Sequence, residues 1–566
     1  MTKTQPSASP CGFVRRCTIQ AIAFLLLLLA GPTALAQVHG GSRPPEPAAP
    51  AAPVRSLDGW EVLTERWYEL TLAGQPCGSI HALVERQGER IRSSKVMQMR
   101  LARGDTTVEV ASETRFVESA RGEPIEASLR QRMGATANSA PTETTVRFRR
   151  DGDAWVADIR EGAEGQVVRE KRLPGSGWLP PAALDRFVTE RIRAGARQIE
   201  YRSVDVESGL ELVTVTMRRK GSGMVNIDHE ATPRTLPVSL WTAIDSLQKI
   251  EVTERYAGDG VLVESAAPLG IGELKTRLTS RERAVNASQR SGAEVLVASF
   301  VPAKRRIFGV MEKMRLAVRV ETKTGEINEF PSVGAQRVRR LAPNALEIAI
   351  DAGRGSEPEP GDATNPAYLA RSSLIDGSAP SVRRILDAAL PKDRELPPAE
   401  RAELLRKATD RALPSKNLAS PFASAAEAAE ARGGDCSEHA VLLAALLRES
   451  GIPARVASGL VYADRFAGER NVWAWHVWTQ ALLPEPDGSL RWRDLDATLP
   501  VPYHAAHICV AVGALEAGAT DPMWTSTLSL IGNLSILDLT GEDAERAFEE
   551  GATPQPTAPQ PTAPQR

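Results

Sequence analysis

The sequence predicts an α+β protein in which antiparallel β-rich domains precede a C-terminal domain of helices and a β-hairpin. Between residues 57 and 285, short runs alternate polar and apolar side chains and end at Gly, Asn or Asp turns, a pattern typical of half-buried strands. From residue 381 onward, apolar residues recur at spacings of three to four, which indicates amphipathic helices. The chain has 566 residues, 42% hydrophobic and 25% charged, which is enough for several globular domains.

The N-terminus has the pattern of a secretory signal. Arg15 and Arg16 precede an apolar run, "AIAFLLLLLAG", and the small residues "ALA" precede Gln37. An uncleaved membrane anchor is the alternative, but the run is shorter than the roughly 20 residues that a spanning helix needs. We therefore expect a signal peptide over residues 1–36, a mature chain without a membrane span, and a secreted or periplasmic location.

Composition divides the rest of the chain into domains and spacers. One segment is rich in Pro and Ala, and a second is rich in Pro, Gly and acidic residues; both compositions are typical of linkers. The C-terminus repeats PTAPQ, which cannot build a core. A helix is expected near residues 180–195, inside the first β region. The predicted parts are a Pro/Ala-rich linker (37–56), a β-rich accessory domain (57–288), a small β domain (289–352), a linker (353–364), the helix and hairpin domain (365–515), a C-terminal segment (516–550) and a disordered Pro/Thr/Gln tail (551–566).

The balance of charges excludes one class of partner. The chain has 69 Lys and Arg against 71 Asp and Glu residues, a formal net charge of −2, so no global field attracts nucleic acid or an anionic surface. Nucleic acid is therefore not an expected partner.

Cysteine is scarce in this chain. Once the signal is removed, Cys77, Cys436 and Cys509 remain, an odd number in a compartment that permits disulfides. At least one thiol must then stay unpaired within the chain. A bridge between Cys77 and Cys509 is an open alternative, and Cys436 is the thiol that we expect to be free.

The stretch "GGDCSEHAVLLAALLRES" places Cys436 at the start of a helix that ends before Gly451 and Pro453. Unpaired backbone N–H groups and the positive end of the helix dipole favour a thiolate there. A small buried hydrophobe is the alternative interpretation of a lone cysteine. Its polar and glycine neighbours favour a nucleophile.

A thiol nucleophile needs a base that a third group orients. His476 lies in the alternating run "NVWAWHVWTQALL", which the turn "PEPDG" connects to a second run, "LRWRDLDAT". If this hairpin is symmetric about Pro486, His476 lies directly opposite Asp496, with Cβ atoms roughly 4.5–5.5 Å apart. Asp494 has the same parity, so a register slip of two residues would exchange the two acids. A solvated strand face is the alternative role for both.

Together these motifs resemble the transglutaminase-like superfamily. The resemblance rests on "GGDCSE", Arg448, "GIPAR", Gly459, "WHVW" and "WRDLDAT", in that order along about 140 residues. It implies a papain-related fold over residues 365–515, with the cysteine helix packed against an antiparallel sheet. By position it assigns Cys436 as nucleophile, His476 as general base and then acid, and Asp496 as orienting group. Ala497 departs from the family pattern, which has Pro there. The preceding β regions resemble accessory domains of secreted bacterial relatives more weakly.

No cofactor and no metal are expected. His504, His507 and Cys509 lie close in sequence, but on a strand His504 would face away from the other two, and no fourth ligand is apparent. We expect a structural histidine near the site instead. Trp473 and Trp475 are expected to be packing residues.

These observations predict a secreted thiol enzyme that hydrolyses peptide or side-chain amides through a thioester. Two alternatives remain open: a crosslinking transglutaminase, which joins an amine to the side-chain acyl group of a protein glutamine, and a catalytically inactive protein-binding module on the same fold. Arylamine acyl transfer is disfavoured by the export signal. The expected substrate is a protein or peptide, and the β domains are expected to position a polymeric substrate at the cell envelope.

Overall fold

The structure is a computed structural model. It describes residues 59–103, 106–134, 142–161, 167–207, 209–227, 234–246, 250–290, 292, 294–416, 423–516 and 530–551. The predicted signal peptide, the linker at 37–56 and almost all of the predicted tail lie outside these residues.

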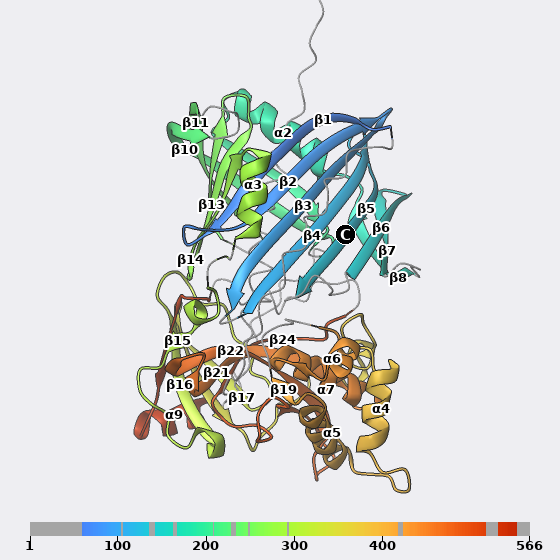
Figure 1. The fold of residues 1–566 in the computed structure, drawn as a ribbon. Coiled ribbons are helices and arrows are strands. Elements are labelled where there is room, and N and C mark those ends of the chain that lie inside the picture. The colour runs from blue at the N-terminus through green and yellow to red at the C-terminus, as the bar shows by residue number, and fades with distance from the viewer. Residues whose placement is uncertain are drawn as a thin grey trace, which may run out of the picture.

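One half of the molecule is a single curved antiparallel sheet of 14 strands (Figure 1). Its order is β8-β7-β6-β5-β4-β3-β2-β1-β14-β13-β12-β11-β10-β9, so two meanders join where β1 pairs with β14 and Trp67 lies opposite Thr279. The strands are β1 (Glu61–Leu72), β2 (Gln75–Gln87), β3 (Arg90–Arg103), β4 (Thr106–Ser119), β5 (Pro124–Gly134), β6 (Thr142–Asp151), β7 (Ala154–Glu161), β8 (Val167–Pro174), β9 (Gln198–Asp205), β10 (Glu211–Ile227), β11 (Arg234–Asp245), β12 (Val252–Ala257), β13 (Leu262–Leu269) and β14 (Gly272–Thr279).

Two helices accompany this sheet. The helix expected near residues 180–195 is present as α2 (Pro181–Arg193). The second, α3 (Arg281–Gln289), was not expected, because its first residues fall in the stretch that the alternating pattern assigned to strands. Only Ala284 and Ala287 of α3 are buried, so it lacks the apolar stripe that identifies a helix. Its start is defined by Ser280, whose side chain accepts a hydrogen bond from the Arg283 backbone N–H.

A four-stranded sheet, ordered β17-β18-β16-β25, lies in the other half of the molecule. Its edge strand β25 comes from the predicted C-terminal segment, and Val320 of β16 lies opposite Ile536 of β25. The chain therefore returns to the small β domain after the helix and hairpin region. The elements are η1 (Val297–Ser299), η2 (Val310–Glu312), β16 (Arg315–Thr322), β17 (Gln336–Ala342), β18 (Ala345–Asp351), η3 (Asp362–Thr364), η4 (Pro366–Tyr368), β25 (Leu534–Asp538) and α9 (Glu542–Gly551).

The remaining elements form a sheet with helices beside it (Figure 1), except that β19 and β20 pair with each other in a separate parallel sheet. The sheet is ordered β15-β22-β21-β24, and β23 also pairs with β22. The elements are β15 (Val301–Pro302), α4 (Pro380–Ala389), α5 (Pro398–Ala412), β19 (Ser415–Lys416), α6 (Ala425–Ala431), β20 (Gly433–Gly434), α7 (Cys436–Glu449), β21 (Ala454–Phe466), β22 (Glu469–Pro484), β23 (Leu490–Leu495) and β24 (His507–Gly513). The predicted α+β fold class, with antiparallel sheets throughout the larger part of the chain, is confirmed.

Helix α7 is the centre of this domain. Every residue from Cys436 to Arg448 is buried, so protein surrounds this helix on all sides. Arg448 fixes its C-terminal end, because its guanidinium donates to the backbone carbonyls of Ala370, Ala454 and Ala514. Within the described part of the chain, no helix combines the length and apolarity needed to cross a membrane.

Candidate active site

The N-terminus of α7 is held by a capping box. The Asp435 side chain accepts from the backbone N–H of Ser437 at 2.8 Å, and the Glu438 carboxylate accepts from the backbone N–H of Asp435 at 2.7 Å. The other Glu438 oxygen accepts from the Ala423 N–H at 2.7 Å. A Cβ atom on Gly434 would lie 2.4 Å from the Cβ of Glu438, so only glycine fits there. The residues from Gly434 to Glu438 therefore fix the N-terminus of α7, where Cys436 is the first helical residue.

Burial shapes the chemistry of this helix start. Burial and the neighbouring Asp435 raise the pKa of Glu438 well above its usual range. His439 lies one turn further along, and its Nδ1 is 2.7 Å from the Asp435 carbonyl oxygen, so that nitrogen donates. Burial lowers the pKa of His439, which keeps the ring neutral. Cys436 itself is fully buried.

Strand β22, which carries His476, packs against α7. The Thr479 hydroxyl, on the same strand, donates to the backbone carbonyl of Ala440 in α7 at 3.0 Å. Val477, next to His476, belongs to the same buried apolar cluster as Cys436. The helix that begins at Cys436 thus packs against the strand that carries His476.

Gly459 makes room for a third strand beside His476. It pairs with His476 across β21 and β22, and with Cys509 of β24 on its other side. A Cβ atom on Gly459 would lie 1.9 Å from the Ile508 carbonyl oxygen, so a larger residue would push β24 away. This close approach places His507, the first residue of β24, near His476.

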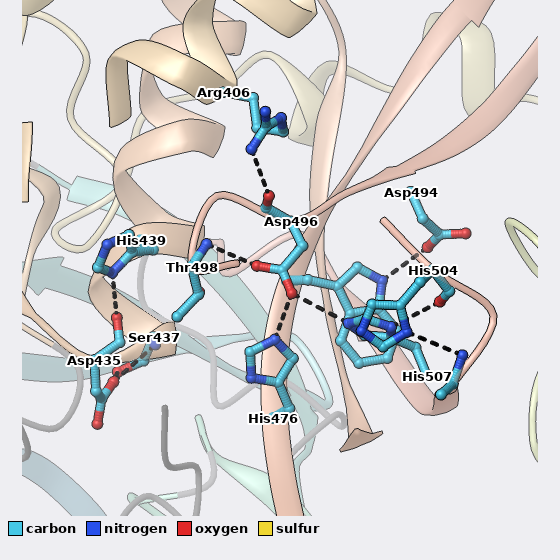
Figure 2. Close-up of polar contacts among 12 residues, drawn as sticks. Arg406, Asp435, Ser437, His439, His476, Asp494, Asp496, Thr498, His504 and His507 are labelled. Carbon is cyan, nitrogen blue, oxygen red and sulfur yellow. Dashed lines mark hydrogen bonds and ion pairs between the residues drawn. The ribbon is translucent and has the colours of Figure 1, made fainter. Parts of the chain in front are cut away.

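His476 and Asp496 form a buried pair. Nε2 of His476 lies 2.7 Å from Oδ2 of Asp496, and neither side chain is exposed. Oδ1 of Asp496 accepts from the Thr498 backbone N–H at 2.7 Å. Figure 2 shows the Asp496 carboxylate between His476 and the backbone of Thr498. Burial by itself would raise the pKa of Asp496, but the imidazoles of His476 and His507 hold that pKa well below its usual range.

This geometry determines which nitrogen of His476 is basic. An ionised carboxylate only accepts hydrogen bonds, so Nε2 of His476 must carry a proton. In the neutral ring the lone pair then lies on Nδ1. Among the described residues, that Nδ1 atom has no hydrogen-bond partner, although it is buried. The pair therefore presents one free basic atom in a site closed to water.

The hairpin register differs from the predicted one. Thr479 pairs with Leu495 and Gln480 with Asp494, so the hairpin is centred on Asp487 rather than Pro486. The predicted direct pairing of His476 with Asp496 is therefore wrong by two residues. The cause lies in the turn, where the Asp487 carboxylate accepts from the Ser489 N–H at 2.9 Å and makes Asp487 the apex.

Asp496 still reaches His476 despite this shift. It follows directly after β23, which ends at Leu495, so its backbone is no longer bound by the ladder. Asp496 donates its backbone N–H to the Pro502 carbonyl oxygen at 2.8 Å, within the turn that leads towards β24. The carboxylate contacts His476 from this turn rather than from a paired strand position.

Asp494 occupies a different environment. Its Oδ1 accepts from the Trp478 indole at 2.8 Å and from the Gln480 amide at 2.7 Å, and its Oδ2 accepts from the Ala335 backbone N–H at 2.7 Å. Burial raises the pKa of Asp494. These contacts tie the hairpin to the small β domain, and Asp496 rather than Asp494 holds the imidazole.

Sequence reasoning did not find that His507 also reaches Asp496. Its Nε2 lies 3.1 Å from Oδ2 of Asp496, and its Nδ1 lies 2.9 Å from the backbone carbonyl oxygen of His504. The ring of His504 takes another role, because its Nδ1 accepts from the Ala506 N–H at 3.2 Å. Burial and the nearby His507 lower the pKa of His504 to about 2. No spacing in the sequence links His507 to Asp496, because an irregular turn connects them.

Histidine and aspartate are common metal ligands, and this site contains His476, Asp496 and His507. One potential ligand atom from each of the three lies within 4.8 Å of the others. Tetrahedral zinc ligands at about 2.0 Å from the ion lie about 3.3 Å apart, farther than the 2.7 Å between His476 and Asp496. Hydrogen bonds account for the observed distances. Cys509 lies outside this cluster, and its backbone N–H donates to Gln336 at 2.8 Å. The expected absence of a metal stays a prediction.

Among the described residues, Cys77, Cys436 and Cys509 form no disulfide, so the alternative bridge between Cys77 and Cys509 is not formed. Burial and the nearby Glu69 raise the pKa of Cys77 to about 12. Burial and Asp494 raise the pKa of Cys509. Trp473 and Trp475 are both buried in the apolar core, as expected for packing residues.

Residues 394–497 match the family model described as the transglutaminase-like superfamily. The matched range contains Cys436, His476 and Asp496. This part of the chain is therefore a transglutaminase-like domain. No curated protein matches the chain.

Several solved structures show low similarity. A beta-barrel-like protein from Brucella abortus is 12% identical, with a TM-score of 0.30, and the match covers 38% of this chain and 95% of that chain. A protein from Cytophaga hutchinsonii, for which a cysteine protease activity has been suggested, is 14% identical, with a TM-score of 0.23 and coverage of 40% and 81%. The periplasmic domain of TgpA from Pseudomonas aeruginosa, bound to ethylmercury, is 15% identical, with a TM-score of 0.22 and coverage of 34% and 92%. Similarities at this level define no function.

Proposed function

We propose that this protein is an extracytoplasmic thiol enzyme that hydrolyses peptide or side-chain amides, with Cys436 as nucleophile, His476 as base and acid, and Asp496 as orienting group. The observation that carries the proposal is the state of His476. Its Nε2 is bound to an ionised carboxylate at 2.7 Å, which leaves Nδ1 as the basic atom. Helix α7, which begins at Cys436, packs against strand β22, which carries His476. The extracytoplasmic location rests on the signal pattern of residues 1–36.

In the first half-reaction, Nδ1 of His476 takes the proton from the Cys436 thiol. The thiolate attacks the amide carbonyl carbon, and a C–S bond forms. The proton on Nδ1 then passes to the departing amine as the C–N bond breaks, which leaves a thioester. Asp496 stays ionised throughout and stabilises the imidazolium that forms in between.

In the second half-reaction, water attacks the thioester carbonyl carbon and gives a proton to Nδ1 of His476. The C–S bond breaks, and the proton returns to the Cys436 sulfur, so the free thiol and a carboxylic acid result. The backbone N–H of Cys436, at the helix start, is the oxyanion donor that we propose. Because Cys436 is fully buried, a substrate reaches its sulfur only after neighbouring groups move.

Water is the acceptor that needs no binding site of its own. Efficient transfer to an amine would need a site that holds the amine in attacking geometry, an advantage that can reach several kcal/mol. The strand around His476 offers Trp473, Trp475 and Trp478, and all three are buried in packing contacts. This favours hydrolysis over amine transfer. The 14-stranded domain is proposed to position a polymeric substrate of the cell envelope.

The test uses the mature chain, residues 37–566, incubated with unfolded casein and a labelled primary amine. Ammonia release, new N-termini and amine incorporation are measured in parallel for the wild type and for Cys436→Ala. We expect ammonia or new N-termini from the wild type only. Incorporation of the amine without matching hydrolysis would establish a crosslinking enzyme, and no product from either protein would support a binding module.

A further inference from the structure

His507 makes two hydrogen bonds that constrain its protonation. Its Nδ1 lies 2.9 Å from the backbone carbonyl oxygen of His504, and a carbonyl oxygen only accepts, so Nδ1 carries a proton. Its Nε2 lies 3.1 Å from Oδ2 of Asp496, which is ionised and also only accepts. Nε2 must then carry a proton as well. Figure 2 shows the ring of His507 between these two acceptors.

We propose that His507 is a positioning residue, held as an imidazolium, that fixes the Asp496 carboxylate toward His476. This inference rests on the proposed function of the site. Neither the His507 nor the Asp496 side chain is exposed, so water cannot supply the missing donor or acceptor. A buried carboxylate that contacts one neutral and one cationic imidazole has its charge compensated inside the protein. Oδ2 of Asp496 then accepts two N–H bonds, and Oδ1 accepts from Thr498.

The surroundings of His507 agree with a cation. The ring of Tyr503 stacks on it with centroids 4.5 Å apart, which suits a cation over an aromatic face. His504 lies at 4.5 Å between centroids and stays neutral, since its pKa is lowered. Burial raises the pKa of Asp494, and the Coulombic attraction of His507 opposes this rise.

A cation at His507 also affects the base. The rings of His476 and His507 have centroids 5.5 Å apart, so a positive charge on one disfavours a positive charge on the other. His507 therefore keeps the Nδ1 atom of His476 unprotonated at rest and available to accept the thiol proton. Replacing His507 with a neutral residue removes this effect and makes His476 easier to protonate.

The direct test is the protonation state of His507, measured by ¹⁵N NMR of the mature chain labelled on histidine. The His507 signals are assigned by their loss in His507→Gln. We expect both ring nitrogens to carry protons at neutral pH. A ring with a single proton would overturn the proposal, and so would a stoichiometric metal ion found in the purified protein, because the metal would then bridge His507 and Asp496. This measurement needs no activity, so it stands even if the proposed function fails.

The functional test compares His507→Gln with His504→Gln. His504 is a matched control, because it supplies its backbone carbonyl oxygen to His507 and that group survives the substitution. We expect the acidic limb of kcat/KM to move to higher pH by about one unit in His507→Gln and to stay in place in His504→Gln. An unchanged profile in His507→Gln, or equal shifts in both variants, would contradict the positioning role.

Discussion

A largely buried carboxylate in the 14-stranded domain and a buried carboxylate in the transglutaminase-like domain have different partners. In the first, Lys95 lies 2.8 Å from Glu207, and Ser112 and Thr114 also donate to the same carboxylate oxygen. These three donors converge on one oxygen of Glu207 and hold it in a structural network. In the second, Asp496 is fully buried, and it holds an imidazole whose other nitrogen has no partner among the described residues. The first arrangement stabilises the fold, and the second leaves one basic atom for the chemistry that we propose.

The same contrast recurs within one hairpin. Asp494 and Asp496 are two residues apart and both are buried. Asp494 accepts three hydrogen bonds from an indole, an amide and a backbone N–H, which join two domains. Asp496 accepts two from imidazoles and one from a backbone N–H. Two residues of the same type and similar burial can thus have different roles, and their hydrogen-bond partners decide which role each has.

The largest effect is expected from Cys436→Ala. Removing the nucleophile should lower kcat for amide hydrolysis by roughly a millionfold, to background, because the remaining groups cannot form the thioester. The measurement is ammonia or N-terminus release by the mature chain. Cys77→Ala, in the accessory domain, is the control and should keep wild-type activity. Comparable losses in both variants would show that Cys436 has no special role.

A smaller loss is expected from Asp496→Asn, about a thousandfold in kcat/KM, because the neutral amide no longer stabilises the imidazolium of His476. Asp494→Asn keeps an oxygen that accepts from Trp478, so its activity should fall less than about tenfold. Steady-state kinetics on one amide substrate compare the two variants. The reverse order would mean that the two acids have exchanged roles.

No change in activity on a small amide is expected from Lys95→Met, although the accessory domain should lose stability. Removing Lys95 leaves Glu207 buried without its cation, which costs about 3–5 kcal/mol. Hydrogen exchange of the β3 and β4 amides in urea measures this loss. Lys275→Met is the matched control, because its pair with Glu273 is exposed and should be worth less than about 1 kcal/mol. Equal destabilisation by both would contradict the structural role of the buried pair.

Much of the local structure was predictable from periodicity. The alternating runs and the helix at Cys436 appear where the spacing placed them, because burial on one face produces that spacing directly. Helix α3 was missed, since its two buried alanines make no stripe. The pairing of β25 with β16 joins residues more than 200 positions apart, and no local pattern specifies such a contact.

The contact between His476 and Asp496 was predictable, but the hairpin register that leads to it was not. The motif around Cys436 and the hairpin indicated Cys436, His476 and Asp496, but the register depended on which turn residue forms the apex, and Asp487 does so through its side chain. His507 contacts Asp496 only because Gly459 lets β24 approach β21 closely. That approach is a property of three strands together. The catalytic roles of the three residues remain predictions.

The central claim is that Cys436 is the reactive thiol of a Cys-His-Asp site, and quantitative alkylation with peptide mapping tests it most directly. The mature chain is treated with iodoacetamide near pH 7.5, and labelling of Cys77, Cys436 and Cys509 is followed over time. Raised thiol pKa values, about 12 for Cys77, should leave Cys77 and Cys509 unlabelled. We expect one equivalent of label on Cys436 and much slower labelling of Cys436 in His476→Ala. Equal, slow labelling of all three cysteines would contradict the account.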